Sequence, residues 1–211
     1  MTNGIVTGNA VIDSIVSRST ISHYDPDFSL ADNEISELIR IATTAPSSFH
    51  MQNWRFIAVR STEAKARLRP IAWDQPKITA AAVVFIIVGQ LPDDRVMPGR
   101  LAPVVQAGIM PPATALDYEA SAHRLYFGKP QIQRDEAIRS GTLAAAAMMY
   151  AANAWGLGST PMIAFDAEPL VEEFGLAPDE VPVMLVAVGA KLPTNWPQKP
   201  RRPVPDVLEF V

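Results

Sequence analysis

The sequence predicts a single α+β domain, and three observations support this fold class. The chain has 211 residues, which fits one domain with ample room for a hydrophobic core. Its composition, 48% hydrophobic and 19% charged residues, is typical of a globular protein. Segments with helical and with strand patterns alternate along the chain, but strand–helix–strand repeats are too few for a regular doubly wound sheet.

Two helices are expected before the first strand. Residues Ala10–Val16 (AVIDSIV) form a short amphipathic segment that leads into polar residues. Asp32 is suited to cap a second helix, along which apolar residues recur at helical spacing. This helix should end near Ala45, because Pro46 disfavours the helical conformation of the residue before it.

A strand, a short helix and a second strand are expected next. Trp54–Val59 (WRFIAV) is aromatic and β-branched, which favours a strand, and Thr62–Leu68 indicates a charged helix. Ala80–Val88 (AAAVVFIIV) is a nearly unbroken apolar run, as expected when both faces of a sheet are covered. The proline- and glycine-rich stretch Leu91–Ala120 indicates a mobile excursion over the surface.

The C-terminal half should contain the longest helix, a short helix and one more strand. Gln133–Trp155 is rich in alanine and is followed by a glycine that stops the helix. Asp166 is suited to cap a short helix that ends at Gly175. Val181–Gly189 (VPVMLVAVG) is a second covered strand, with its proline near the start.

The tail after Lys191 carries five prolines and should stay extended until about Asp206. We expect such an arm to dock on a partner subunit rather than to float free.

Charge and residue content exclude several classes of protein and site. Eighteen basic and twenty-two acidic residues give a net charge of −4, which offers no footprint for nucleic acid or an anionic membrane. Without cysteine there is no disulfide, iron–sulfur cluster or cysteine nucleophile, and three histidines make a metal site unexpected. No signal-peptide pattern opens the chain, and the longest apolar run, Ile78–Gly89, is too short to span a bilayer. We therefore expect a cytoplasmic, soluble protein.

Two polar segments could bind a ligand. Arg18-Ser19-Thr20-Ile21-Ser22 combines an arginine fork with hydroxyls and backbone amides, which suits a phosphate, although a solvated helix end is the simpler interpretation of these residues alone. Ala45–Phe56 (APSSFHMQNWRF) places many polar groups between a helix end and a strand. An ordinary turn explains each of its residues singly but not their density.

Two further segments are notable for their small or basic residues. Trp155–Asp166 (WGLGSTPMIAFD) lacks the third glycine of a dinucleotide fingerprint, but its small residues can bring backbone amides close to a flat ligand. Lys199-Pro200-Arg201-Arg202-Pro203 clusters three cations in an acidic chain, which indicates either a solvated turn or one anionic partner. The sequence has no hydrolase, Walker or zinc-protease motif, and this points to a cofactor that carries the chemistry.

In this order and spacing the four segments resemble the nitroreductase family of FMN enzymes, in particular bacterial NAD(P)H nitroreductases of about this length. The resemblance covers nearly the whole chain and is strongest in APSSFHMQNWRF and GLGSTPMIAFD. It implies that Arg18, Ser19 and Thr20 hold the phosphate and ribityl chain of FMN. Ser22 stands where a second cation is usual, and Arg202 is a spare cation that could compensate.

The same resemblance implies the remaining cofactor contacts. These residues are Pro46, Ser47, Ser48, His50, Asp74, Ser140, Pro161, Met162, Ile163, Ala164, Lys199 and Arg201. The loop at Pro46 should reach the flavin from a neighbouring subunit, with His50 in place of the usual asparagine. The strip Pro161–Ala164 should lie along the flavin ring with a backbone N–H near N5, and Lys77 is a candidate charge near N1 and O2.

The implied activity is that of an FMN-dependent oxidoreductase working by a ping-pong mechanism. NAD(P)H reduces the flavin, which then reduces nitroaromatics, quinones or similar small acceptors. No protein residue is expected to be catalytic, because the flavin carries the chemistry. A flavin-dependent dehydrogenase or oxidase of a small metabolite, and a non-catalytic flavin-binding protein, are the alternative hypotheses.

The implied assembly is an intertwined homodimer with both sites at the interface, built on a mainly antiparallel sheet wrapped by helices. Residues 1–211 would form one domain, with a lid at about 91–126 and a C-terminal arm at about 191–211. Tyr126 and Phe127 are candidate substrate contacts of the lid, with ordinary packing as the equally supported alternative.

Overall fold

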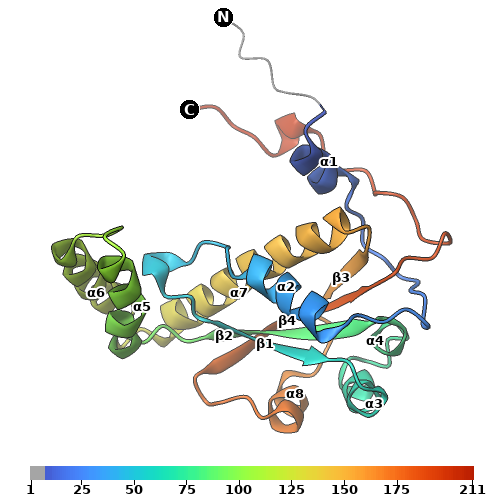
Figure 1. Ribbon diagram of the computed structural model, residues 1–211, viewed down its shortest axis with the longest axis horizontal. Coiled ribbons are helices and arrows are strands. Elements are labelled where there is room, and N and C mark those ends of the chain that lie inside the picture. The colour runs from blue at the N-terminus through green and yellow to red at the C-terminus, as the bar shows by residue number, and fades with distance from the viewer. Residues whose placement is uncertain (1–7) are drawn as a thin grey trace, which may run out of the picture.

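The computed structural model, which describes residues 8–211, is built around one four-stranded antiparallel sheet (Figure 1). The strands are ordered β1-β2-β4-β3, and their bounds are β1 Trp54–Val59, β2 Val83–Gln90, β3 Gly158–Met162 and β4 Glu180–Gly189. The helices are α1 Ala10–Ser17, α2 Asp32–Ala42, α3 Thr62–Ile71, α4 Lys77–Ala80, α5 Met97–Gln106, α6 Pro112–Tyr126, α7 Pro130–Ala154 and α8 Ala167–Phe174. The predicted α+β class and the antiparallel sheet are therefore confirmed.

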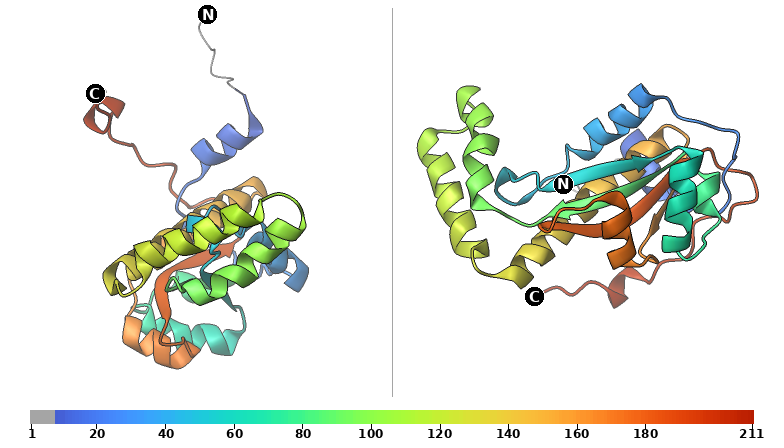
Figure 2. Two further views of the ribbon diagram at one scale, coloured as in Figure 1. Left: turned by 90° about the vertical axis from the view of Figure 1, so that its left-hand side faces the viewer. Right: turned by 90° about the horizontal axis from the view of Figure 1, so that it is seen from below.

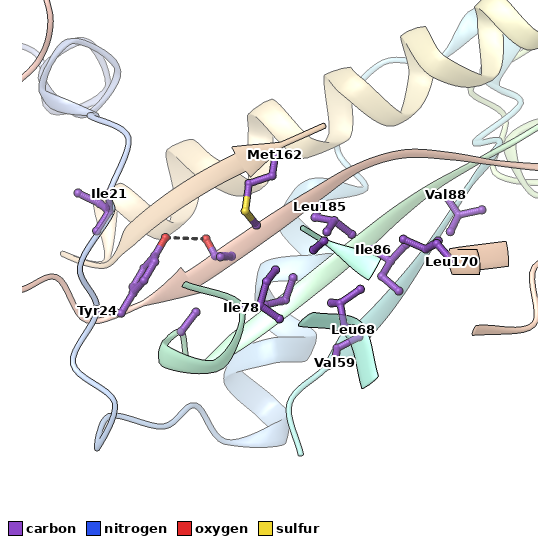
Figure 3. Packing of buried hydrophobic residues seen from close by; sticks show 14 of the residues in the cluster. Ile21, Tyr24, Val59, Leu68, Ile78, Ile86, Val88, Met162, Leu170 and Leu185 are labelled. Atoms are coloured by element: carbon purple, nitrogen blue, oxygen red, sulfur yellow. Dashed lines mark hydrogen bonds between the residues drawn. The ribbon is translucent and has the colours of Figure 1, made fainter. Parts of the chain in front are cut away.

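Side chains of the central strand β2 alternate between two hydrophobic clusters, one on each face of the sheet. The even-numbered residues from Val84 to Val88 pack against Leu68 of α3 and Leu170 of α8 (Figure 3). The odd-numbered residues from Val83 to Ile87 belong to the cluster formed with α2 and α7. Helices on both faces explain why this strand is an unbroken apolar run. It begins later than the expected Ala80, because that residue ends α4.

The longest helix, α7, lies close to the sheet. A Cβ atom at Gly89 of β2 would collide with the carbonyl oxygen of Ala137, so glycine is required at this contact. The alanine-rich sequence of α7 serves the same close packing, with Ala144, Ala145 and Ala152 fully buried.

The helix caps differ in detail from the sequence prediction. Asp32 is the first residue of α2 rather than its cap: Ala31 is the N-cap, and its backbone N–H donates to the Glu34 carboxylate at 2.8 Å. Asp166 is the N-cap residue of α8 as expected, but its carboxylate accepts a hydrogen bond from Trp73 Nε1 at 3.0 Å and makes no capping hydrogen bond. Gly175 ends α8 as expected, with a φ of 60°.

The expectation of an irregular excursion over Leu91–Ala120 is wrong. This region contains α5 and most of α6, which pack beside each other at one end of the molecule (Figure 1). Pro98 and Pro112 lie in the first turns of these helices, where the missing N–H costs nothing and the fixed φ favours the helix. Gly108, with a φ of 70°, lies in the connection between them. Pro98, Pro112 and Gly108 therefore mark helix boundaries, while Pro103 lies within α5.

The segment Thr20–Tyr24 runs beside β3 and the start of the C-terminal arm, at the end of the sheet away from α5 and α6 (Figure 1). Residue Tyr24 forms an antiparallel bridge with Lys191, and Thr20 forms a parallel bridge with Ser159 at the edge of β3. The arm after Lys191 is extended, with one short 3₁₀ turn at Val204–Asp206, as its prolines predict. Among residues 8–211, no helix is both long and apolar enough to cross a membrane.

Candidate functional site

The first and fourth predicted segments meet in one cavity, here called the arm cavity. It has a volume of about 310 Å³ and lies where the C-terminal arm passes the segment after α1. Its lining residues are Thr20, Ser22, His23, Thr194, Asn195, Trp196, Pro197, Gln198, Lys199 and Arg201. Four of the residues expected to hold a phosphate therefore surround one space, although they lie almost two hundred positions apart in the chain.

Arg18 lies beside the arm cavity with its backbone fixed and one guanidinium nitrogen unpaired. Its carbonyl oxygen accepts a hydrogen bond at 2.7 Å from Nε2 of Gln198, which lines the cavity. Its Nη1 atom is buried and finds no hydrogen-bond acceptor within residues 8–211. A buried charged donor without a partner is costly, so an anionic ligand would be stabilising here. Ser19, the next residue, is half-buried and does not line the cavity.

Lys199 and Arg201, the two cations of the arm that line the cavity, form no ion pair with a carboxylate of the described chain. Arg201 donates to the side-chain oxygen of Gln198 at 3.0 Å, and Lys199 Nζ lies 5.6 Å from the ring centre of Trp196. Their charges are therefore available to an anion in the cavity. Arg202, the expected spare cation, donates to the carbonyl of Asp206 and does not line the cavity.

Close packing holds the N-terminal segment against β3. A Cβ atom at Gly158 would lie 2.5 Å from Cγ1 of Ile21, so glycine is needed for this approach. The Tyr24 hydroxyl lies 2.7 Å from Thr160 Oγ1 (Figure 3), and burial raises the pKa of Tyr24. These contacts fix both the Arg18 backbone and the strand that leads into the predicted flavin strip.

The predicted flavin strip, Pro161–Ala164, meets the turn that contains Asp74. The last carbonyl of the strip accepts a hydrogen bond from Gln75 Nε2 at 3.2 Å. Trp73 and Asp74 have positive φ angles of 54° and 53°, so the backbone turns sharply at this point. Ile163 of the strip is 80% exposed and presents an open apolar surface. Asp74 and the strip Pro161–Ala164, which the resemblance assigned to the flavin ring, therefore lie next to each other although they are far apart in the sequence.

Lys77 begins α4, two residues after this turn. It is half-buried and has no carboxylate partner within residues 8–211. Burial lowers the pKa of its ammonium group, because desolvation disfavours the charged form. An electron-rich ligand next to it would favour the charged form again.

The predicted loop Pro46–His50 lies at the other end of the molecule, beside α6 (Figure 1). The Ser47 hydroxyl accepts a hydrogen bond from the backbone N–H of Gln52 at 2.8 Å. Phe49, His50 and Gln52 have positive φ angles of 48°, 58° and 47°, a conformation that strains residues other than glycine. His50 also pairs with the Gln52 side chain at 3.0 Å. The polar groups of the loop are therefore largely engaged with one another.

Tyr126 of α6 holds this loop in place. Its hydroxyl donates to Ser48 Oγ at 2.8 Å, and its ring makes an edge-to-face contact with Phe49 at a centroid distance of 6.4 Å. The side chain is only 4% exposed, and burial raises the pKa of Tyr126. Tyr126 was expected to be either a substrate contact or a packing residue, and the structure supports packing. Phe127 is different: it is 65% exposed and stacks on His123 at 4.6 Å.

Ser140 is not brought to either of these places. It is fully buried in α7, where its hydroxyl donates to Glu136 Oε1 at 3.2 Å. Glu136 in turn pairs with Arg139. Within this chain Ser140 thus completes a polar contact inside the helix, and it lines neither the arm cavity nor the loop surface.

The two halves of the predicted site are separated within one chain. A hollow of about 700 Å³ is lined by Pro46, Ser47 and His50, and it shares no residue with the arm cavity. The loop lies beside α5 and α6, whereas the N-terminal segment and the start of the arm lie at the far end of the sheet (Figure 1 and the right-hand view of Figure 2). One chain therefore does not bring both sets of residues around a single cavity.

Sequence reasoning missed two residues that shape the arm cavity, Asn195 and Gln198. Both are polar amides between the prolines of the arm, and both bond to the N-terminal segment. Amide side chains in a proline-rich stretch that cannot form regular structure are a usable signal, since they replace backbone pairing with side-chain hydrogen bonds.

Comparison with known proteins gives consistent matches over most of the chain. The model of the Nitroreductase family matches residues 15–190. Protein DrgA of Synechocystis is 34% identical over 85% of this chain and 83% of its own. YdgI of Bacillus subtilis, a candidate NAD(P)H nitroreductase, is 29% identical over 98% of this chain and 100% of its own. The solved structure of a candidate nitroreductase from Exiguobacterium sibiricum, in complex with FMN, has a TM-score of 0.88 and 26% identity, covering 99% of this chain and 100% of that one.

Proposed function

The chain belongs to the nitroreductase family, and we propose that it is an FMN-dependent oxidoreductase that takes electrons from NAD(P)H and delivers them to nitroaromatics, quinones or similar small acceptors. Support comes from the relative named as an NAD(P)H nitroreductase and from the similar structure that was crystallised with FMN. Family membership and the geometry of the arm cavity are independent lines of support.

The observation that carries the proposal is the unpaired cationic charge around the arm cavity. Arg18 has a buried nitrogen without an acceptor, and Lys199 and Arg201 have no carboxylate partner in the described chain. Hydroxyls of Thr20 and Ser22 stand in the same cavity. Guanidinium, ammonium and hydroxyl donors are the groups that proteins use to hold a phosphate, so these residues fit the phosphate of FMN.

The chemistry of the reaction would be supplied by FMN, which accepts a hydride from a nicotinamide and reduces a second substrate. The protein's part is to bind and orient. We propose that the strip Pro161–Ala164 and the turn at Asp74 and Gln75 line the ring side of the site, where they already meet through a hydrogen bond. Lys77 would hold positive charge near that ring, at a half-buried position where the lower effective dielectric strengthens its interaction with nearby negative charge.

We propose that the complete site is shared by two copies of the chain in a homodimer. The loop Pro46–Ser48 and His50 would reach the flavin held by the partner, since they lie far from the arm cavity of their own chain. Exposed apolar residues on α1 (Val11 and Val16) and on the arm give such a dimer apolar surface to bury. In this arrangement residues 91–126 act as a lid and residues 191–211 as a docking arm.

An absorbance spectrum of the purified protein tests the proposal. We expect the yellow spectrum of bound flavin, release of FMN on denaturation, and rapid bleaching on anaerobic mixing with NADH or NADPH. A colourless protein that takes up no added FMN would overturn it. Bound flavin that no nicotinamide reduces would overturn the proposed direction of electron flow.

A further inference from the structure

The arm is fastened to the N-terminal segment mainly through one side chain, that of Asn195. Its Oδ1 atom accepts hydrogen bonds from the backbone N–H groups of Ser22 and His23, at 2.8 and 2.9 Å. Its Nδ2 atom donates to the carbonyl oxygens of His23 and Leu192, at 2.6 and 2.9 Å. A carboxamide has two donor hydrogens and two acceptor lone pairs, so this side chain is fully used.

The hydrogen bonds of Asn195 also affect where the residues that follow it in the arm lie. Gln198, three residues later, donates to the carbonyl of Arg18 and accepts from Arg201. Among residues 8–211, the backbone ties between the arm and this segment are the bridge of Lys191 with Tyr24 and the N–H of Leu192 to the carbonyl of His23 at 3.2 Å, both at the start of the arm. The placement of the arm's cations therefore depends on the point at which Asn195 pins the arm.

We propose that Asn195 is a positioning residue, which closes the C-terminal arm onto the segment Arg18–His23 and thereby places Lys199 and Arg201 at the anion site. The identity of the anion as the phosphate of FMN rests on the proposed function, whereas the closure of the arm does not. The Asn195 side chain bonds only to backbone atoms and carries no charge. Its effect on the affinity for an anion is therefore exerted through the positions of Lys199 and Arg201.

Limited trypsin digestion tests the closure without any cofactor. Trypsin cleaves after lysine and arginine but poorly before proline, so the arm offers the bonds after Lys191 and Arg201, while Lys199 and Arg202 are each followed by proline. In Asn195→Ala we expect cleavage after these two residues to become at least about tenfold faster than in the wild type, since four hydrogen bonds are lost. Asn33→Ala is the matched control, because Asn33 is an exposed asparagine of α2.

Comparison of FMN with riboflavin then separates positioning from general destabilisation. Riboflavin lacks the phosphate, so Asn195→Ala should raise the Kd of FMN by roughly tenfold or more while changing that of riboflavin by less than about threefold. Asn195→Leu, which keeps the size of the side chain without its hydrogen bonds, should behave in the same way and serves if the alanine variant folds poorly.

The outcomes are distinguishable from failure of the proposed function. If the wild type binds no FMN, the digestion still tests the closure of the arm. Unchanged cleavage in both Asn195 variants would overturn the proposal. Faster cleavage with an unchanged FMN Kd, or an equal loss of FMN and riboflavin affinity, would overturn the positioning role.

Discussion

The arm cavity and the loop Pro46–His50, at opposite ends of the sheet, differ in how their polar and charged groups are paired. At the arm cavity, Lys199 and Arg201 form no ion pair in the described chain, and Arg18, which bonds to the cavity residue Gln198 without lining the cavity itself, has a buried and unpaired nitrogen. At the loop Pro46–His50, polar groups are bonded within the loop or to α6, and the cost is backbone strain at Phe49 and its neighbours. One end is electrostatically incomplete, whereas the other is complete but conformationally constrained.

This difference indicates a division of labour. Unpaired cations gain most of their interaction energy when an anion arrives, so the arm cavity should supply affinity. A rigid, internally satisfied loop loses little entropy on binding and should supply shape. Because the two ends do not approach each other in one chain, affinity and shape would be combined only when two chains assemble.

The largest effect should come from Arg18→Ala. We expect the Kd of FMN to rise about 100-fold, because charge-assisted contacts to a phosphate are worth about 1.5–3 kcal/mol. The FMN-free protein should keep its unfolding free energy or gain up to about 1 kcal/mol, since an unpaired buried donor is removed. Fluorescence titration and thermal melts of the FMN-free protein measure both. A melting temperature that falls while FMN affinity is retained would show that Arg18 is a structural residue.

A smaller loss is expected for Arg201→Ala. The side chain is exposed and solvent screens its charge, so the Kd of FMN should rise about tenfold without a change in folding. The same titration, run beside Arg202→Ala, provides the control, since Arg202 does not line the cavity. Equal effects of the two substitutions would mean that only net charge matters, and unchanged FMN affinity would remove Arg201 from the site.

At the loop, Tyr126→Phe should act on stability first. The variant keeps the ring packed against Phe49 but removes the donor to Ser48, which should cost about 1 kcal/mol of unfolding free energy. Denaturant melts measure this cost. The Kd of FMN should change by less than about threefold; a change as large as that of Arg201→Ala would contradict the division between affinity and shape.

The smallest effect concerns an ion pair at the loop end of the sheet, which contrasts with the unpaired cations of the arm. Two hydrogen bonds of 2.7 Å join Arg55 to Glu180 and hold the pKa of Glu180 below its ordinary value of 4.5. A lowered folded-state pKa gives stability that is present above the ordinary pKa and is lost as pH falls through the folded value. Glu180→Gln should therefore weaken the loss of stability below about pH 4.5. Identical acid limbs in denaturant melts of the two proteins would contradict this.

Local sequence patterns predicted the helices and strands whose residue preferences agree with their packing in the fold. The aromatic, β-branched run Trp54–Val59 is a strand with those bounds, and the long helix ends one residue before the predicted Trp155. The residues of the phosphate end were found because cations and hydroxyls cluster in Arg18–Ser22 and Lys199–Pro203. That these residues lie around one cavity could be predicted only from the family resemblance, because no local pattern relates Thr20 to Lys199.

The failures share a physical cause, which is that side chains found partners that the local sequence does not reveal. The Asp166 side chain bonds to Trp73, between α3 and α4, so it does not make the capping hydrogen bond expected from the sequence. The high proline content of Leu91–Ala120 argued against helices there, but Pro98 and Pro112 lie in the first turns of α5 and α6, where proline stabilises a helix. Asn195 was missed because its four partners are all backbone atoms: an amide between prolines signals that such hydrogen bonds form, but not with which segment of the chain.

Complementation between two defective chains tests the shared site most directly. One chain carries Arg18→Ala with Arg201→Ala, the other carries His50→Trp, which fills the loop surface, and the two are co-expressed with different tags and purified as a mixed pair. Each variant alone should retain little FMN. If the site is shared, the mixed dimer contains one site with every lesion and one with none, so it should bind one FMN per two chains and be reduced by NAD(P)H. A mixed dimer as empty as its parents, or the failure of the two chains to pair at all, would contradict the account.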